Sequence, residues 1–589
     1  MRHLTSILAL VAAAATAGPV TAEVRLTVSG GADTLQDDLR AASRLVSLGE
    51  PSTQSAQDVI AAARSDYSRL LAALYERGYF GPVLSIRLDG VEAADLSPFR
   101  GGTAFQTVEI AVEPGRAFRL GQAQIAPLAP RTEVPEEFAP GGPATTPLLR
   151  RTAEAGISGW RDAGHAAAVI ADQSITARQA DAELDVDIRL DPGPLAIFGT
   201  LTPTGQERMR EDRIRRIAGL PSGTQFDPAT LDRVAGRLRD TGAFSSVALT
   251  EQPIAEDGTL DLQAELVEAP LRRLGFGAQV SSNDGVGLSA YWLHRNLFGG
   301  AERLRLDAEV SGLGGENGGY DALLSAHYSR PASLTPDTTL EFGVTLEHLD
   351  EVTFTDDRIA LSAGLSRWFS ETLDGSLAIE LSRSEVTDAF STRGVTMLSL
   401  PAALTWDNRD DAFDPRNGAY AELGVAPFAM EDGSGGVRLD LDTRGYMGFG
   451  ENDRTRLAAR LQLGTVDGGA VATLPPDWLY FSGGAGTVRG QSYQSLGAVQ
   501  GGVQTGGRSF AGVSLELRQD IIGNWGAALF ADAGYVSTDA YWSGSSDWHS
   551  GAGVGVRYDT PVGPIRFDLA APLNDTGGVS FYIGIGQAF

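Results

Sequence analysis

The sequence contains no cysteine and no lysine among its 589 residues. Without cysteine the chain forms no disulfide and has no thiolate to act as a nucleophile or a metal ligand. Without lysine, all 47 basic residues are arginines, and 75 acidic residues outnumber them to give a formal net charge of −28. Because nucleic acid phosphates need a basic surface, so acidic a chain is a poor candidate for binding DNA or RNA.

Long hydrophobic runs are also missing beyond the N-terminus. A transmembrane helix needs about 20 apolar residues, and no later run reaches that length. The N-terminus has Arg2, an apolar stretch from Leu4 to Ala17, and a small-residue sequence ending at Ala22. This order is typical of a secretory signal peptide, here over residues 1–22. The alternative, a membrane anchor, is disfavoured because the run is short, so we expect cleavage after Ala22 and export of the chain.

Catalytic and metal-binding patterns are scarce. The six histidines are scattered, with neither an H-E-x-x-H zinc motif nor a G-x-S-x-G nucleophile turn. The acidic stretch DNRDDAFDPRNG at 407–418 offers oxygen ligands, but it lacks the glycine and the glutamate that an EF-hand loop needs. Pro415 and Asn417-Gly418 favour a turn there instead. We therefore expect neither an enzyme, nor a cofactor, nor a metal site.

Residues 23–270 repeat a pattern of helix, glycine and strand. The apolar periodicity predicts helices over 58–80, 145–166 and 227–244. Each helix is closed by a glycine where a left-handed C-cap is needed, at Gly78, Gly164 and Gly242. An extended segment follows each helix, so the local unit combines helix and strand.

Three prolines close successive units at a fixed period. Pro114, Pro192 and Pro270 are separated by 78 residues each time. Fixed spacing is typical of repeated small domains. We predict three α+β units, each with a strand, two helices and a short sheet, over residues 23–113, 114–192 and 193–270.

After residue 270 the apolar pattern changes to period two. In RLRLDAEVSG, residues 303–312, every second side chain is apolar and the others are mostly charged, and 437–444 and 456–463 repeat this alternation. Seven of the eight tryptophans and eleven of the fourteen tyrosines follow residue 270, and such rings are enriched at bilayer interfaces. About sixteen strands of roughly 10 residues fit there. We predict a closed outer-membrane barrel of 16 antiparallel strands over 271–589; a soluble β-protein is the disfavoured alternative.

The chain ends in an alternating, uncharged strand, GVSFYIGIGQAF. As the edge of a soluble sheet it would promote aggregation, whereas closure against a first strand at about 272–282 removes the free edge. A terminal phenylalanine on such a strand resembles the signal by which outer-membrane barrels are recognised for insertion. We assign the barrel-assembly signal and the closing strand to Phe581, Ile583, Gly584, Ile585, Gly586 and Phe589.

Three exported α+β repeats, a sixteen-strand barrel and the tripeptide VRG in a long late loop resemble the BamA/TamA superfamily of outer-membrane assembly proteins. The repeats resemble its POTRA domains. Further matching segments are RNLFGGAE (295–302), DNRDDAFDPRNG (407–418), SLELRQD (514–520), FADAG (530–534) and the final hairpin (555–573). Three repeats are most similar to the TamA branch, because BamA has five and two-partner secretion transporters have two with a plug helix.

The resemblance implies that the VRG tripeptide locks a loop inside the barrel. Its residues here are Val488, Arg489 and Gly490. Arg489 is then expected to reach the barrel wall, where the implied partners are Glu516, Phe530, Asp532 and Gly534. For Asp532 to point inward, Ala531 and Ala533 must face lipid. A solvated loop arginine is the alternative, and the family's usual aromatic residue after VRG is replaced here by Gln491.

The resemblance further implies an outer-membrane insertase or translocation factor of a Gram-negative bacterium, with the repeats in the periplasm and a monomeric barrel. Clients would add a strand where the seam between the first and last strands opens. The implied partners are outer-membrane lipid, client barrel or autotransporter proteins and a TamB-like periplasmic protein. The alternatives are a two-partner secretion transporter and a passive porin or receptor barrel.

Overall fold

A computed structural model describes residues 24–32, 34–48, 54–97, 105–281, 285–314, 319–500, 502–560, 563–574 and 578–585. The predicted signal peptide with its cleavage site at Ala22 lies outside these residues, as do Gly586, Phe589 and the side chain of Ile585. The chain forms two compact units. One comprises Met1–Gly199, Ser222–Thr230 and Pro253–Leu260, and the other Thr200–Pro221, Leu231–Gln252 and Asp261–Phe589.

The first small sheet has the strand order β1-β4-β2-β3, with β1 parallel to β4. Its elements are β1 (Val24–Val28), α1 (Leu35–Ala42), α2 (Arg44–Ser47), α3 (Ala56–Glu76), β2 (Val83–Leu88), β3 (Val91–Glu92) and β4 (Val108–Glu113). Apolar side chains of α1 and α3, such as Leu39 and Ile60, pack with Ile86 and Ile110 in one fully buried core. This unit therefore folds around its own apolar centre.

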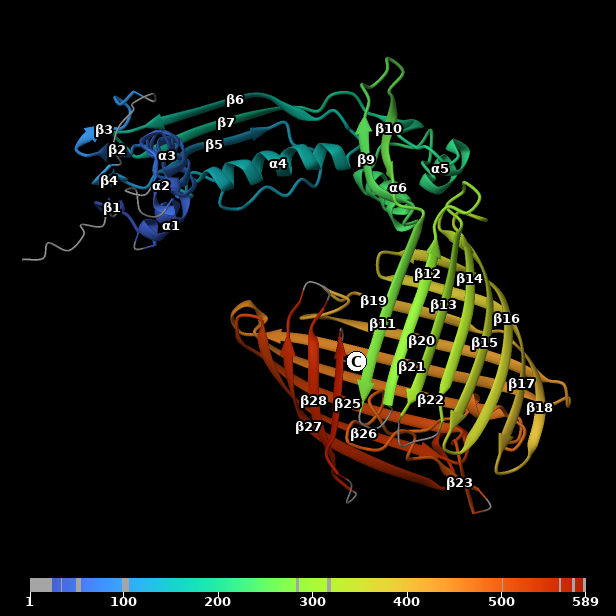
Figure 1. Cartoon of the computed structure of the whole chain (residues 1–589). Helices are drawn as coiled ribbons and strands as arrows, with labels where there is room; N and C mark the ends of the chain where they lie inside the picture. Colours follow the sequence, from blue (N-terminus) through green and yellow to red (C-terminus); the bar gives the residue numbers. More distant parts are fainter. Residues whose placement is uncertain are drawn as a thin grey trace, which may run out of the picture. The chain divides into compact units, whose positions relative to one another are not determined.

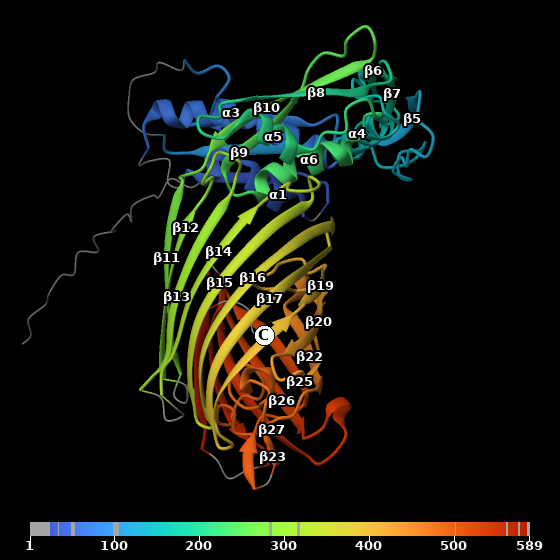
Figure 2. The same cartoon turned by 90° about the vertical axis from the view of Figure 1, so that its right-hand side faces the viewer.

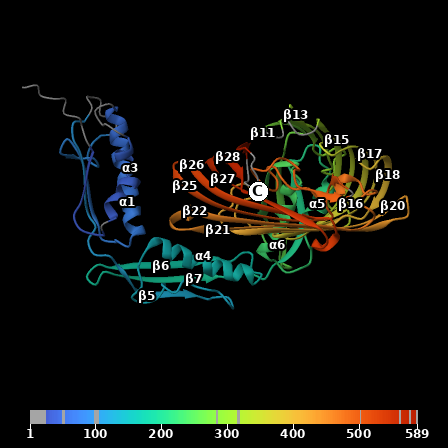
Figure 3. The ribbon, with the colours of Figure 1, turned by 90° about the horizontal axis from the view of Figure 1, so that it is seen from below.

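The second small sheet has the order β5-β7-β6, with α4 along one face (Figures 1 and 3). Its elements are β5 (Arg119–Ala126), α4 (Thr146–Asp162), β6 (Val169–Arg178) and β7 (Glu183–Asp191). The two helices predicted for this unit are reduced to one, which corrects the sequence interpretation. Residues 127–144 contain five prolines, which lack the N–H donors that a helix needs, and they form turns instead.

The third small sheet has the order β8-β10-β9. Its elements are β8 (Ile197–Thr204), α5 (Glu211–Ala218), α6 (Pro228–Asp240), β9 (Phe244–Glu251) and β10 (Thr259–Glu268). Gly78, Gly164 and Gly242 have φ angles of +85°, +97° and +64°, so the predicted helix-ending glycines are confirmed. The exact limits proposed for the three units remain predictions. Among the described helices, none combines the length and apolarity needed to cross a membrane.

The rest of the chain forms a closed antiparallel barrel (Figures 1 and 2). Its strands are β11 (Arg272–Ser281), β12 (Gly285–His294), β13 (Arg303–Leu313), β14 (Asp321–Arg330), β15 (Thr338–Glu351), β16 (Phe354–Ser370), β17 (Leu373–Asp388), β18 (Thr392–Ser399), β19 (Ala402–Asp407), β20 (Gly418–Met430), β21 (Gly435–Phe449), β22 (Thr455–Gly468), β25 (Ser509–Ile522), β26 (Trp525–Ser537), β27 (Ser546–Tyr558), β28 (Ile565–Pro572) and β29 (Ser580–Ile585). Both β18 and β19 pair with β17 and with β20, so they are two parts of one strand interrupted at Pro401. The described strands are thus consistent with the sixteen predicted.

The two faces of the barrel have opposite character. Outward side chains are apolar and exposed, as for Leu377, Leu423 and Leu529, whereas the alternate side chains point into the lumen. Exposed aromatic side chains stand at both ends of the strands, at Trp368, Trp406, Trp525, Trp548 and Tyr558. An apolar band between aromatic girdles is the surface that a barrel presents to lipid.

Strand connections differ at the two ends of the barrel. At the end where β11 begins, here called the turn end, successive strands are joined by short connections. At the other end, the loop end, β22 and β25 are joined by residues 469–508, here called the lumen loop. This loop contains β23 (Ala498–Gln500) and β24 (Val503–Thr505), and β23 lies at the loop end in Figure 2.

Candidate functional site in the barrel lumen

The lumen loop folds back into the barrel and presents Arg489 to the wall. The Nε and Nη2 atoms of Arg489 donate to the two carboxylate oxygens of Asp532, at 2.8 and 2.9 Å. The backbone N–H of Arg489 donates to the same carboxylate at 3.1 Å. A bidentate pair of this kind fixes both the position and the orientation of the guanidinium.

Two further carboxylates complete the surroundings of Arg489. Its Nη1 atom lies 2.9 Å from Glu516 Oε2 and 3.4 Å from Asp568 Oδ2. The guanidinium carbon lies 3.6 Å from the centre of the Phe530 ring, close enough for a cation–π contact. The resemblance implied Glu516, Phe530 and Asp532 as partners, and the structure brings all three to Arg489.

Two wall arginines balance these carboxylates. Arg518 Nε and Arg557 Nη2 each lie 2.9 Å from Glu516 Oε1, and Arg557 Nη1 lies 2.5 Å from Asp568 Oδ1. We call the six charged groups the lock cluster: Arg489, Glu516, Arg518, Asp532, Arg557 and Asp568. All six are buried, and their formal charges cancel, as charges removed from water require.

Sequence reasoning missed three members of the lock cluster. Arg518 lies two residues after Glu516 on the same strand, so strict alternation places both in the lumen. Asp568 and Arg557 alternate with outward apolar residues in the same way. The period-two pattern could therefore have identified them as lumen residues, although it could not have shown which of them meet.

Close approach of the loop depends on glycines. A Cβ atom added to Gly534 would lie 2.2 Å from Ser482 Oγ and 2.9 Å from Val488 Cγ2, both in the lumen loop. Gly490 has a φ of +93°, and an added Cβ would lie 2.7 Å from the carbonyl carbon of Ala571. Phe530, Asp532 and Gly534 are buried in the lumen whereas Ala531 and Ala533 are exposed, which is the strand phase that the resemblance implied.

The barrel closes through a short seam. In the described residues, β11 pairs with β29 only at Val280↔Ile583 and Ser281↔Tyr582. By contrast, all ten residues of β11 pair with β12. Phe581 and Ile583 face outward on β29, and Gly584 pairs with β28. In the described wall, this seam therefore has fewer backbone pairs than any other joint between neighbouring strands.

The closing strand is also held from inside by the loop. Tyr582 on β29 accepts a hydrogen bond through its hydroxyl from the backbone N–H of Gly490, at 3.0 Å. Its ring packs in a buried cluster with Phe530 and Ala570. The lumen loop thus joins the lock cluster to the strand at the seam, a contact that sequence reasoning did not anticipate.

Gln491 replaces an aromatic contact with polar ones. Its side-chain amide donates to the carbonyl of Ser550 at 2.8 Å and to Asn574 Oδ1 at 3.3 Å, and the residue is buried. Nearby, the hydroxyl of Tyr493 donates to Glu351 at 3.1 Å. The tip of the loop is therefore fixed by hydrogen bonds at the position where the resemblance implies an aromatic side chain.

Replacing Tyr582 with phenylalanine should loosen the seam while keeping the ring. The buried Gly490 N–H would lose its acceptor, at a cost of about 1–3 kcal/mol. We expect faster amide hydrogen exchange in β29, measured by mass spectrometry on the detergent-solubilised protein. Tyr558→Phe, on an outward-facing tyrosine of β27, is the control and should not change exchange. Equal exchange in all three proteins would show that the hydroxyl does not hold the strand.

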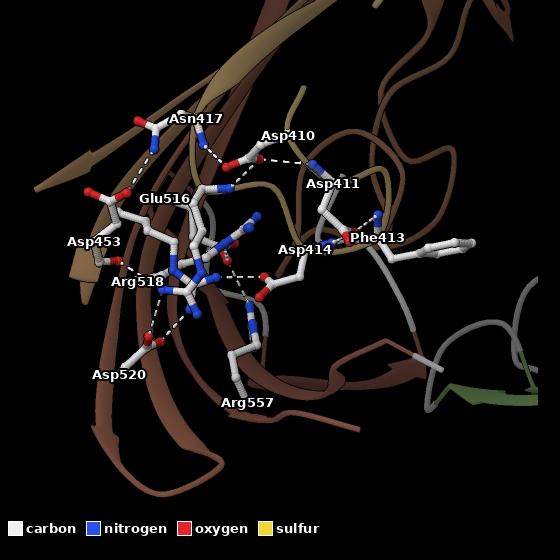
Figure 4. Close-up of polar contacts among 12 residues, drawn as sticks. Asp410, Asp411, Phe413, Asp414, Asn417, Asp453, Glu516, Arg518, Asp520 and Arg557 are labelled. Carbon is white, nitrogen blue, oxygen red and sulfur yellow. Dashed lines mark hydrogen bonds and ion pairs between the residues drawn. The ribbon is translucent and has the colours of Figure 1, made fainter. Parts of the chain in front are cut away.

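The stretch at 407–418 forms a turn between β19 and β20, as predicted. The Asp410 carboxylate accepts hydrogen bonds from the backbone N–H groups of Arg416 and Asn417, at 2.9 and 3.1 Å. Asp411 accepts from the N–H groups of Phe413 and Asp414, at 2.6 and 2.8 Å (Figure 4). These carboxylates bind backbone donors and pre-form the turn.

Side chains of this turn also fix it to the turn end of the lumen. Asp414 lies 2.6 Å from Arg456 of β22, which also pairs with Asp520 of β25. Asn417 Nδ2 donates to Asp453 at 2.9 Å (Figure 4). Asp520 follows Glu516 and Arg518 on the inward face of β25, so the turn is attached to the strand that carries part of the lock cluster.

These features define the class of the protein: a lipid-facing β-barrel preceded by small α/β units and closed inside by a salt-bridged loop. Residues 296–589 match the Omp85 superfamily domain. Through this barrel the chain belongs to the Omp85 superfamily, which includes BamA-type proteins.

Curated relatives are distant and longer. The chain is 24% identical over 436 residues to the chloroplastic outer envelope protein 80 of Oryza sativa, covering 65% of this chain and 60% of that protein. It is 24% identical over 402 residues to the outer membrane protein assembly factor BamA of Nitratidesulfovibrio vulgaris, covering 63% and 48%. The alignments thus span about half to three-fifths of those relatives.

Solved structures share the fold at low identity. BamA from Haemophilus ducreyi lacking POTRA domains 1–3 superposes with a TM-score of 0.61 and 16% identity, covering 80% of this chain and all of that one. CdiB from Acinetobacter baumannii superposes with a TM-score of 0.51 and 13% identity, covering 80% and 90%. Both likenesses show a common architecture of small α/β domains and barrel.

Proposed function

We propose that this protein inserts or translocates client proteins at the outer membrane of a Gram-negative bacterium, without enzymatic chemistry or a cofactor. The observation that carries the proposal is the seam between β11 and β29, which has two residue pairs in the described part of the wall and is held from inside by the lumen loop. Similarity to a protein named as an outer membrane assembly factor supports the same class of activity. The barrel acts as a monomer in outer-membrane lipid, with the α/β units in the periplasm.

The mechanism follows from strand pairing. Opening the seam, which has two residue pairs in the described strands, frees an edge of β11, and a free edge binds any extended strand through backbone hydrogen bonds. A client hairpin can therefore add to the wall without sequence recognition. Because the client buries its own apolar face in lipid as it folds, no nucleotide is needed to drive the step.

The periplasmic units offer a second kind of edge. Strand β6 pairs only with β7 in its sheet, and all ten of its residues are exposed, including Val169 and Ile175. An exposed strand edge with apolar side chains can take up an extended segment of a client or partner. Because three small sheets precede the barrel, we propose that the protein belongs to the TamA branch. Its partner at this exposed edge would then be a large TamB-like periplasmic protein.

Two alternatives make different predictions for the same barrel. A two-partner secretion transporter passes an unfolded client through the lumen, and the fold is shared with CdiB. A passive porin conducts solutes through the lumen, which here is crossed by a loop pinned at Arg489. An insertase instead passes its clients through the opened wall of the barrel. Clients that become folded in the lipid therefore distinguish insertion from two-partner secretion and from a porin.

The test is client assembly in vesicles that contain the purified protein. Unfolded autotransporter barrels and simple outer-membrane barrels are supplied as clients, and folding is read by heat-resistant mobility and protease protection. We expect assembly to exceed that in empty vesicles and in vesicles with a porin. Transport of a secreted filamentous client without barrel assembly would favour two-partner secretion, and solute flux alone would favour a porin. Co-purification from outer membranes identifies the periplasmic partner.

A further inference from the structure

Arginines gather at the turn end of the first three barrel strands, which lie side by side (Figure 1). On β13, Arg303 and Arg305 alternate with the outward side chains of Leu304 and Leu306. Because alternate side chains of a strand face opposite sides of the sheet, both arginines point into the lumen. They stand where β13 begins, next to the mouth of the barrel.

Two more arginines stand beside them. Arg273 of β11 and Arg305 both pair with Leu293 of β12, so the three residues form one row on the lumen face and the outer two are about 10 Å apart. Arg295 follows β12 and donates through Nη1 to the carbonyl of Pro270, just before β11, at 3.0 Å. Four residues thus surround the start of β11 and are here called the seam arginines: Arg273, Arg295, Arg303 and Arg305.

The charge of this group is not balanced. Arg305 forms an ion pair with Asp307 at 2.6 Å, whereas in the described part of the chain Arg273, Arg295 and Arg303 form none. The charged groups that act on Arg303 are themselves arginines, Arg295 and Arg305. Four guanidinium groups and one carboxylate leave a formal charge of +3, in contrast to the neutral lock cluster. Like charges held together repel each other, so the group favours the binding of an anion.

Acidic side chains of the adjacent elements are bound elsewhere. Glu302, directly before β13, accepts hydrogen bonds from the backbone N–H groups of Phe298 and Gly300, at 3.1 and 2.8 Å. Glu341 of β15 accepts from the hydroxyl of Ser366 at 2.6 Å. Neither carboxylate forms an ion pair with a seam arginine, so neither supplies the missing negative charge.

A tyrosine brings one of the charges toward the seam. A Cβ atom added to Gly275 of β11 would lie 2.1 Å from Cε1 of Tyr291, so the ring of this β12 residue extends over the lumen face of β11. The guanidinium carbon of Arg305 lies 4.4 Å from the centre of that ring, a cation–π contact. The charge of a β13 residue is therefore held close to the edge strand.

The direction of the seam fixes which end of a strand reaches the seam arginines. β29 is antiparallel to β11, with Val280 opposite Ile583 and Ser281 opposite Tyr582. Since β11 begins at the turn end, any strand that takes the place of β29 runs from the loop end to the turn end. Its C-terminal end therefore approaches Arg273.

We propose that the seam arginines bind the C-terminal carboxylate of a client strand paired with β11. This rests on the proposed function and names its preferred substrates: chains whose last strand ends in a free carboxylate. Guanidinium groups match carboxylates in charge and in planar shape. The seam arginines face the lumen rather than the lipid, which favours a carboxylate carried by the strand over a phospholipid headgroup.

The test compares two forms of one client barrel in vesicles that contain the full-length protein. One form ends at its last strand, and the other carries a short neutral Gly-Ser extension that moves the carboxylate away. Arg273→Gln with Arg303→Gln removes two of the cations. Arg367→Gln, on an exposed arginine near the turn end of β16, is the matched control. Heat-modifiable mobility first shows that each barrel is folded, and the assays are run with and without phosphatidylglycerol.

We expect the wild type and the control to assemble the unextended client several-fold faster than the extended one. In the double variant this ratio should fall close to one, and Arg303→Gln alone covers the case in which the double variant does not fold. Equal rates for the two clients with the wild type, or a wild-type ratio in the folded variants, would overturn the proposal. An effect of the variants that needs phosphatidylglycerol and is the same for both clients would assign the arginines to lipid instead.

A binding measurement separates this inference from the proposed function. A synthetic peptide that copies residues 578–589 is prepared as the free acid and as the amide, and its binding to the detergent-solubilised protein is read by fluorescence anisotropy. We expect several-fold tighter binding of the free acid, with the difference lost in the double variant. If no client assembles, the proposed function fails, and this measurement still decides the inference: equal binding or no binding of the two forms contradicts it.

Discussion

Replacing Arg489 with alanine is expected to leave a folded barrel that assembles clients poorly. Arg489 is the only member of the lock cluster that comes from the lumen loop, so its removal releases the loop from the wall. It also leaves Asp532 buried without the guanidinium that neutralises it and gives the remaining five groups a net charge of −1. Removing one partner of a buried ion pair costs about 3–5 kcal/mol.

This cost falls on the loop rather than on the strands. The wall keeps its backbone pairing, with thirteen residue pairs between β25 and β26, so heat-modifiable mobility should remain. Freed from Arg489, the backbone of Gly490 no longer holds Tyr582, and the closing strand loses its attachment from inside. We expect client assembly in vesicles to fall by at least about tenfold, the change that 1.4 kcal/mol produces.

Two substitutions sharpen this result. Arg489→Lys keeps the charge but not the planar fork, so it should recover only part of the activity. Arg383→Ala removes an arginine whose side chain is 60% exposed, and it should behave as wild type. Wild-type client assembly by a folded Arg489→Ala protein would contradict a functional role for the lock cluster.

Cross-linking the seam is expected to abolish client assembly. Val280 and Ile583 are register partners across β11 and β29. Paired Cα atoms in antiparallel strands lie about 4.5–5.5 Å apart, within the range that a disulfide spans. The chain has no cysteine, so Val280→Cys with Ile583→Cys introduces one unambiguous bond. Oxidation should stop assembly, and a reductant should restore it.

The matched control places the same bond where no opening is expected. Ala278 and Leu288 are register partners across β11 and β12, which pair along their whole length. Oxidised Ala278→Cys with Leu288→Cys should assemble clients as the reduced protein does. If the seam disulfide forms fully and assembly continues, clients do not enter through this joint, and a route through the lumen becomes the better account.

Much of the architecture followed from local pattern. A period of two separates inward from outward side chains whatever the shape of the sheet, so the phase of Phe530, Asp532 and Gly534 could be predicted from one strand. Gly78, Gly164 and Gly242 end helices because a left-handed residue there needs no Cβ. The second helix expected before α4 is absent because five prolines break the backbone hydrogen-bond ladder.

The site was predictable only in part. The resemblance joined Arg489 to Asp532, but Asp568 lies 79 residues beyond Arg489 and enters the same cluster through β28. Arg557 arrives from β27 in the same way. No period in the sequence relates these positions, because their meeting depends on the register between strands and on the path of the loop through the lumen.

The sequence by itself predicts an export signal. It also determined the change from helical repeats to alternating strands and which side chains of each strand face inward, because these features depend on neighbours within a few residues. Only the tertiary structure decided the balance of the lock cluster, the hydrogen bond from Gly490 to Tyr582, and the buried apolar cluster around Leu474 and Trp478. Those features arise where a loop meets a closed wall, and closure brings together residues that no local rule can pair.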